Sequence, residues 1–318
     1  MSTDSTAQPE PADPRHGRHP ADSPHGRHPA DLPKGLDPVD IPQGLDPADI
    51  PHTVPEAGPE TSPQDSPRHV PQHAAGGAPP TAATESHLRL VWIYPDLLST
   101  YGDRGNLLIL ARRAELRALP VECIEVRSDQ ALPADGDIYL IGGGEDGPQA
   151  LAAQRLATDG GLHRAVDRGA VVFAVCAGYQ LMGGSFFAKG AKCPGLGLLD
   201  LDSDRGPSRA VGELAGDVDL ALGLPPLTGF ENHGGRTHLG PGARPLARVT
   251  TGVGNDGATE GAWHGKIIGT YSHGPALARN PAMADLLLRW ATDSELDPID
   301  DVWPERLRAE RLHSVGAR

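Results

Sequence analysis

Residues 170–180 read AVVFAVCAGYQ, and they give the clearest indication of the fold class. Its first six residues are continuously apolar, as in a strand of a sheet that is covered on both faces. Cys176 ends the strand, and the pair Ala177-Gly178 permits a sharp turn into a helix. We expect this elbow to expose the sulfur at the carboxyl edge of a parallel sheet, where such sheets bind ligands. The helix start would favour the thiolate, and the backbone N–H of Ala177 would be placed to bind an oxyanion.

Strands and helices alternate on both sides of this elbow. Four strands are expected before it or ending at it, at residues 88–94, 121–126, 137–141 and 170–175. Helices are expected between them, at residues 107–119, where Pro120 ends the helix, and at residues 148–168. The alternation predicts an α/β fold with a doubly wound, mostly parallel sheet flanked by helices. Beyond residue 194 the sequence is richer in strands, expected at residues 212–220, 246–250, 261–263 and 266–271, with a last helix at residues 281–291.

Composition divides the chain into three parts. Residues 1–86 hold 18 of the 32 prolines and have no Trp, Tyr, Phe or Cys, so this segment cannot bury enough apolar surface to offset its ordering entropy. We predict a disordered tail there, with a nine-residue repeat over residues 16–51 whose prolines favour extended chain. Residues 87–293 are expected to form one domain, and residues 294–318 a charged C-terminal extension.

The overall charge and the cysteines exclude several classes of protein. The formal net charge is −14, which argues against a nucleic-acid or anionic-membrane partner. Three cysteines do not suggest a disulfide framework, and a reducing cytoplasm fits them. No apolar run reaches the roughly 20 residues of a transmembrane segment. Cys123, inside a strand, and Cys193, in the loop GAKCPG, are expected to be inert, buried residues, and we expect no metal site.

A second motif supplies a partner for the elbow cysteine. Residues 267–275 read IIGTYSHGP, so that a strand ends and His273 follows at once, again at a sheet edge. A thiol nucleophile needs a base within hydrogen-bond reach, and histidine is suited to this at neutral pH. A lone histidine at a strand end is more often structural, and the pairing with Cys176 is what favours catalysis. His233, in the segment ENHGG, is the rival candidate for the base.

These motifs together resemble a known family. Residues 175–180 (VCAGYQ) are similar to the C-x-G-x-Q elbow of class I glutamine amidotransferases, and residues 271–275 (YSHGP) to the Y-x-H-G-P variant of the cobyric-acid-synthase-like branch. Within that branch the sequence most resembles the glutaminase subunits of lipid II isoglutaminyl synthases. Three further segments carry that likeness: YGDRGN at residues 101–106, IGGGEDGPQ at 141–149 and GFENHGGRT at 229–237.

The resemblance implies the catalytic roles. Cys176 would attack the side-chain amide of L-glutamine and His273 would serve as the base, giving glutamate and ammonia. Many class I members place a Glu two residues after the histidine, but this sequence has Pro275 there. Either a Cys–His pair suffices or another acid orients His273. Asp103 in the YGDRGN turn is our candidate, and capping of the next helix is an equally good interpretation of that residue.

The resemblance also implies substrate-binding residues. Arg209 stands where the family has an arginine that holds the substrate glutamine, and an arginine fork suits an α-carboxylate. Without the resemblance, a solvated surface arginine would be the better interpretation. Gly143 and Gly144 would supply a second oxyanion N–H, since glycine allows close backbone approach. Ala177 and Gln180 are expected to line the same site.

Asn232, His233 and Arg236 are predicted to form a loop at the site or at a partner.

A partner chain follows from the chemistry that this chain lacks. No G-x-x-x-x-G-K-[ST] loop is present, so activation by ATP and Mg²⁺ is expected on another chain, and no cofactor on this one. By resemblance that chain is a Mur-ligase-like synthetase forming a heterodimer, with D-glutamate of lipid II as the acceptor and D-isoglutamine as the product. The alternatives are a glutaminase for another synthetase, such as one making cobyric acid, a non-catalytic binding module, or a cysteine peptidase.

Overall fold

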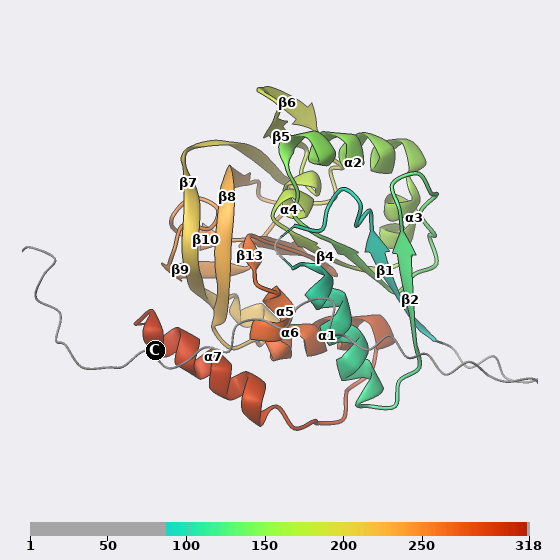
Figure 1. Cartoon of the computed structure of the whole chain (residues 1–318), viewed down its shortest axis with the longest axis vertical. Coiled ribbons are helices and arrows are strands. Elements are labelled where there is room, and N and C mark those ends of the chain that lie inside the picture. Colours follow the sequence, from blue (N-terminus) through green and yellow to red (C-terminus); the bar gives the residue numbers. More distant parts are fainter. Residues whose placement is uncertain (1–86, 101, 317–318) are drawn as a thin grey trace, which may run out of the picture. The chain divides into compact units, whose positions relative to one another are not determined.

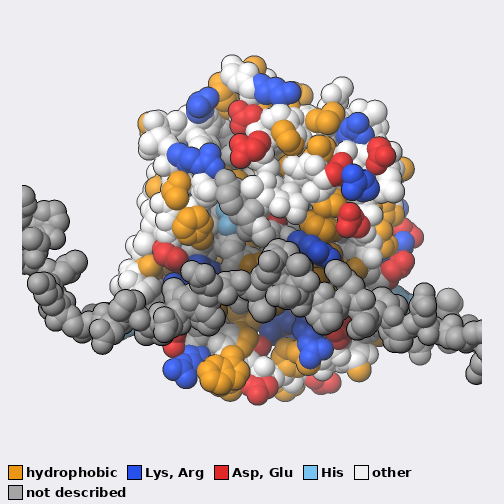
Figure 2. All heavy atoms as spheres, viewed as in Figure 1, with side chains coloured by type: hydrophobic (Ala, Val, Ile, Leu, Met, Phe, Trp, Pro, Cys, Tyr) orange, Lys and Arg blue, Asp and Glu red, His pale blue; other side chains and the backbone are white. Residues whose placement is uncertain are grey.

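The computed structural model describes residues 87–100 and 102–316 (Figure 1). The predicted disorder and repeat of residues 1–86 lie outside the described residues. On the face shown in Figure 2, basic and acidic side chains of the described residues are interspersed. No helix in the described part of the chain is long and apolar enough to cross a bilayer.

A six-stranded sheet forms the centre of the fold, in the order β11-β12-β4-β3-β1-β2. Every neighbouring pair is parallel except β11 with β12. The β3 and β4 strands are buried along their whole length, which is why their sequences are continuously apolar. The strands are β1 (Leu88–Ile93), β2 (Val121–Val126), β3 (Ile138–Ile141), β4 (Val171–Val175), β11 (Ala262–His264) and β12 (Ile267–Thr270).

Helices cover both faces of this sheet, so the predicted doubly wound α/β class is confirmed (Figure 1). The single helix expected at residues 148–168 is two helices, because Gly160 adopts a left-handed conformation with φ of 66° and ends the first one. The helices of the main body are α1 (Arg104–Glu115), α2 (Asp146–Asp159), α3 (Gly161–Asp167), α4 (Ala177–Leu181), α5 (Ala276–Arg279) and α6 (Pro281–Thr292).

A second, largely antiparallel sheet stands beside the first one, to the left in Figure 1. Its two long strands, β7 (Leu201–Val218) and β8 (Leu227–Leu239), pair along most of their length. The sequence predicted only part of β7, and it predicted no strand at β8. The remaining strands of this sheet are β5 (Ser185–Ala188), β6 (Ala191–Pro194), β9 (Ala247–Thr251), β10 (Thr259–Glu260) and β13 (Ser272–His273), and the 3-10 turn η2 (Leu220–Leu222) follows β7.

The segment expected as a charged extension contains a further helix, α7 (Val302–Ser314). A buried ionic cluster fastens its start to the body. Arg113 on α1 donates both to the carboxylate of Asp285, at 2.7 Å, and to that of Asp301, at 2.6 Å. The Arg113 side chain is only 6% exposed, so these bonds are largely shielded from water.

Two cysteines lie in settings that differ from the prediction. Cys123 is exposed, not buried, because β2 is the edge strand of its sheet. Partial burial nevertheless raises the pKa of its thiol. Cys193 lies in the strand β6 and not in a loop, and is partly buried.

Candidate active site

The elbow at the end of β4 makes the expected sharp turn, and its backbone is strained. Cys176 adopts φ of 53° and ψ of −107°, a conformation that costs a side-chain-bearing residue about 1–3 kcal/mol and persists only where the surroundings enforce it. The Cys176 N–H donates to Thr270 O at 2.8 Å, and the Gly178 N–H donates to Gly142 O at 3.1 Å. A Cβ on Gly178 would lie 2.6 Å from Ile141 Cγ2, so only glycine lets the turn pack this closely on β3. The helix α4 has only five residues, so its dipole contributes less than we expected.

Three buried side chains converge at this elbow. The His273 Nδ1–H donates to Asp103 Oδ1 at 3.2 Å, and the ring also forms a hydrogen bond with the Cys176 sulfur. Gly143 lies among them, since a Cβ there would be 3.0 Å from His273 Cε1 and 3.4 Å from Cys176 Cβ. His273 is 1% exposed and Asp103 is 4% exposed. The structure therefore brings together the cysteine, the histidine and the acid that the sequence singled out.

The two neighbours of His273 control its charge. Burial alone would lower the pKa of His273, but the hydrogen bonds and negative charges of Asp103 and Cys176 outweigh it and raise the pKa from 6.5 to about 10. At neutral pH the ring is therefore an imidazolium between the Asp103 side chain and the Cys176 sulfur. An imidazolium next to a cysteine favours the thiolate, which is the nucleophilic form of a cysteine.

Asp103 reaches His273 because two motifs pack against each other. Asp103 occupies the N-cap position of α1, but its side chain makes no capping hydrogen bond. Its other oxygen accepts the Gly143 N–H at 2.6 Å. Pro275 packs on the first turn of α1, where a Cβ on Gly105 would lie 2.0 Å from Pro275 Cγ. Pro275, which stands where many class I members have a Glu, thus forms the contact that places Asp103 next to His273.

A pocket opens beside the sulfur, and it contains most of the predicted substrate-binding residues. Gly144, Ala177, Gln180 and Arg209 all line it. The prediction for Gly143 was wrong in this structure, because its N–H is taken by the Asp103 carboxylate. The pocket wall carries charges of both signs, contributed by Glu145, Asp146, Asp204, Arg205 and Arg209.

Arg209 lies on an irregular part of β7, where the register with β8 shifts between Arg205 and Ala210. Its Nε donates to Asn232 Oδ1 at 2.6 Å, and its Nη2 to Asn232 O at 3.4 Å. The strand β8 thus directs an otherwise exposed guanidinium toward the pocket.

The segment of Asn232, His233 and Arg236 is a strand and not a loop, because it pairs with β7. His233 is not the base. Its Nδ1 faces Gly235 O at 3.0 Å and its Nε2 faces Glu231 Oε2 at 3.2 Å, so both nitrogens are engaged. Arg236 donates to Gly235 O at 2.7 Å beside this segment.

Sequence reasoning missed a buried hydrogen-bond chain beneath the pocket. Gln149 Nε2 donates to Gln180 Oε1 at 2.8 Å, and Gln180 Nε2 donates to the Tyr271 hydroxyl at 3.0 Å. That hydroxyl also bonds Thr237 Oγ1 at 2.7 Å. Gln180 therefore has two roles: it lines the pocket, and it supports the segment that leads into His273. The glutamines lie in the quoted motifs, but only the fold shows that they meet.

Glu260 is a second support that the sequence did not reveal. It is fully buried, and its Oε1 accepts the Tyr271 N–H at 2.9 Å and the Thr270 hydroxyl. The Thr270 hydroxyl in turn accepts the Ser272 N–H at 2.9 Å. This carboxyl group therefore holds the turn that leads from β12 into His273.

A cysteine elbow on a parallel sheet with a histidine beside it is the arrangement of the class I glutamine amidotransferases. Comparison with known proteins agrees. The sequence model of the CobB/CobQ-like glutamine amidotransferase domain matches residues 89–281. The chain belongs to this family, and it is an enzyme of the glutamine amidotransferase type.

Its relatives include the GatD subunits of lipid II isoglutaminyl synthase (glutamine-hydrolyzing). The subunit of Staphylococcus aureus is 35% identical over 210 residues, which is 64% of this chain and 84% of the relative. That of Streptococcus pneumoniae is 30% identical over 239 residues, 70% of this chain and 90% of the relative. The cobyric acid synthase of Rhizobium leguminosarum is 36% identical over 170 residues, which is 50% of this chain but 33% of that protein.

Proposed function

We propose that this chain is the glutaminase subunit of a lipid II isoglutaminyl synthase. It would hydrolyse L-glutamine to glutamate and pass the ammonia to a Mur-ligase-like synthetase chain. The observation that carries the hydrolysis is the buried contact of His273 with Cys176, oriented by Asp103 and located beside the pocket. The similarity to two GatD subunits over most of their length supports the choice of pathway.

The proposed reaction needs only groups that are already in place. The Cys176 thiolate attacks the amide carbon of glutamine, and the backbone N–H of Ala177 holds the oxyanion, with Gly144 as the candidate second donor. The imidazolium of His273 protonates the leaving nitrogen, so that ammonia departs and a γ-glutamyl thioester remains. Water then attacks the thioester while the neutral ring accepts its proton. Glutamate leaves, and the ion pair with the thiolate forms again.

The mixed charges of the pocket suit a free amino acid. Arg209, held by Asn232, would bind the α-carboxylate through its guanidinium. The carboxylates of Glu145, Asp146 and Asp204 give the same wall sites for an α-ammonium group. A peptide bond within a chain carries neither terminal charge, so this pocket favours glutamine over a peptide substrate.

The proposal assigns activation of the acceptor to the partner. ATP and Mg²⁺ would bind to the synthetase chain, in the cytoplasm, and the two chains would form a heterodimer. The acceptor would be the α-carboxylate of D-glutamate in lipid II, which would become D-isoglutamine. Similarity to a cobyric acid synthase supports a cobyric-acid-type acceptor as the second candidate.

Reconstitution tests the proposal. The purified chain and its co-purifying synthetase are incubated with ATP, Mg²⁺, glutamine and a lipid II precursor, and the product mass is measured. We expect conversion of one carboxyl group to an amide, and no conversion with Cys176→Ala unless free ammonia is supplied. Amidation of a cobyric-acid-type acceptor in place of lipid II would contradict the proposed pathway, and full activity of Cys176→Ala would contradict the proposed mechanism.

A further inference from the structure

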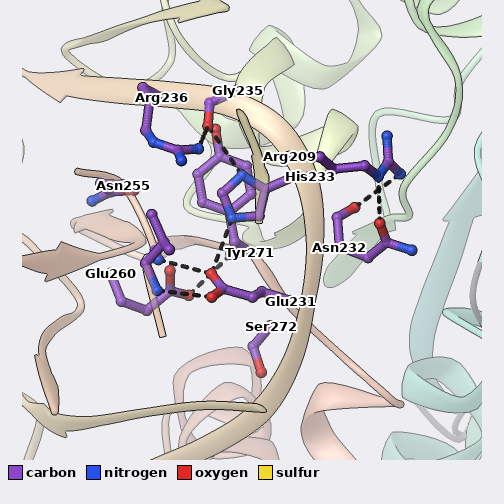
Figure 3. A network of polar contacts seen from close by, with 12 residues as sticks. Arg209, Glu231, Asn232, His233, Gly235, Arg236, Asn255, Glu260, Tyr271 and Ser272 are labelled. Carbon is purple, nitrogen blue, oxygen red and sulfur yellow. Dashed lines mark hydrogen bonds and ion pairs between the residues drawn. The ribbon is translucent and has the colours of Figure 1, made fainter. Parts of the chain in front are cut away.

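A buried pair, Glu231 and His233, borders the pocket and takes no part in the proposed chemistry. Glu231 and His233 are each 2% exposed, and they stand two residues apart on β8. Alternate residues of a strand share one face, so both side chains point into the core while Asn232 points toward the pocket. Figure 3 shows this division, with Arg209 and Asn232 on one side of the strand and the pair on the other.

Several buried hydrogen bonds hold both members of the pair in place. Glu231 Oε1 accepts the Val253 N–H at 2.7 Å, and its Oε2 accepts the Gly254 N–H at 2.8 Å as well as the bond from His233. Burial alone would raise the pKa of Glu231, but these hydrogen bonds outweigh it and lower the pKa. His233 thus faces a carboxylate at Nε2 and the Gly235 carbonyl at Nδ1. Both ring nitrogens are therefore engaged, and these two contacts fix the orientation of the ring.

The pair contacts the strand that bears the base. The His233 ring stacks on Tyr271 with centroids 3.7 Å apart and planes 13° from parallel (Figure 3). The same β8 segment pairs with β13, where His273 lies opposite Phe230. A displacement of the His233 ring would therefore also move Tyr271, which lies two residues before the base His273.

The pair also fixes the arginine side of the pocket. Asn232 lies between Glu231 and His233 in the chain, and its carbonyl and side chain both accept from Arg209. Because both neighbours of Asn232 are anchored in the core, the position of the amide relative to the guanidinium is fixed.

We infer that Glu231 and His233 are positioning residues. Through the strand β8 they fix the position of Arg209, which would bind the substrate, relative to the catalytic His273. The inference rests on the proposed function, because it concerns the site that would hydrolyse glutamine. Neither side chain needs to touch the reacting atoms. What they supply is the relative placement of Arg209 and His273, and a shift of about 1 Å in such a placement can cost about a hundredfold in rate.

The test uses covalent labelling of Cys176 in the full-length chain, followed by intact mass. The probe is 6-diazo-5-oxo-L-norleucine, a glutamine-like electrophile that carries both α-substituents, and iodoacetamide serves as the reagent without them. His233→Gln removes the imidazole ring, and Glu231→Gln/His233→Gln also removes the carboxylate, so that no carboxylate is left buried without its partner. His238→Gln is the matched control, an exposed histidine on the same strand.

We expect both pair variants to remain folded, to need at least about tenfold more of the glutamine-like probe for half-maximal labelling, and to label more slowly at saturation. Labelling by iodoacetamide should fall less, since it does not depend on Arg209, and His238→Gln should match the wild type within about twofold. Equal labelling of wild type and pair variants would overturn the inference, as would an equal loss for both reagents. Failure of the double variant to fold would also overturn it, since the pair would then serve the fold. If the wild type is not labelled at Cys176 by the glutamine-like probe, the proposed function itself is wrong.

Discussion

Glu260→Gln should change how stability depends on pH. Burial, with the charge of Glu231 as a smaller cause, raises the pKa of Glu260 from 4.5 to about 7 against the hydrogen bonds that it accepts. A raised pKa means that the folded state binds the proton more tightly than the unfolded state does. Protonation of Glu260 therefore stabilises the fold fully below pH 4.5, and this contribution is lost as pH rises through about 7. At about 1.4 kcal/mol per pH unit, the loss is about 3 kcal/mol. Glutamine cannot ionise, and its carbonyl can still accept from Thr270 and Tyr271.

Urea unfolding followed by tryptophan fluorescence measures this effect in the wild type and the variant from pH 4 to pH 8. Other titrating groups affect both proteins alike, so the difference between the two free energies of unfolding isolates Glu260. We expect that difference to move by about 3 kcal/mol in favour of the variant as pH rises. A difference that stays constant across the range would refute the assignment of a buried carboxyl group that resists ionisation.

Three further substitutions test the site and its support. Asp103→Asn should lower glutamine turnover about a hundredfold or more with little change in melting temperature, because His273 loses the carboxylate that orients it; unchanged turnover would mean that a Cys–His pair suffices. Gly178→Ala should cost about 1–3 kcal/mol in urea unfolding and reduce activity, because the new methyl group would lie under 3.0 Å from β3; normal stability would show that the turn is not tight. Arg113→Leu should cost about 3 kcal/mol, because two carboxylates lose a shared buried cation; a loss below about 1 kcal/mol would show that solvent screens this cluster.

The central sheet could be predicted because the local sequence of its buried strands already indicates strand structure. The β3 and β4 strands are buried on both faces and are therefore apolar at every position. The expected helix at residues 107–119 is α1, but it begins at Arg104 and ends at Glu115, since Ala118 turns with φ of 55°. The β8 strand could not be predicted, because GFENHGGRT has no apolar alternation and its strand conformation depends on long-range pairing with β7.

The site divides in the same way between local and long-range features. Adjacent residues specify the elbow at Cys176 and the strand end before His273, so both features could be predicted from the sequence. The contact between Asp103 and His273 joins residues 170 apart in sequence, so the motif could nominate the acid but could not choose between helix capping and orientation of the base. Glu260 gave no signal at all, because a glutamate at the end of a short strand is usually exposed.

The most direct test of the central claim is to trap the acyl-enzyme. Wild-type chain is mixed with radiolabelled glutamine, quenched in acid and digested, and the labelled peptide is identified by mass. We expect a γ-glutamyl thioester on Cys176 that is absent from Cys176→Ser and forms much more slowly in His273→Asn. Glutamine turnover without label on Cys176, or with label on Cys123 or Cys193, would contradict the account.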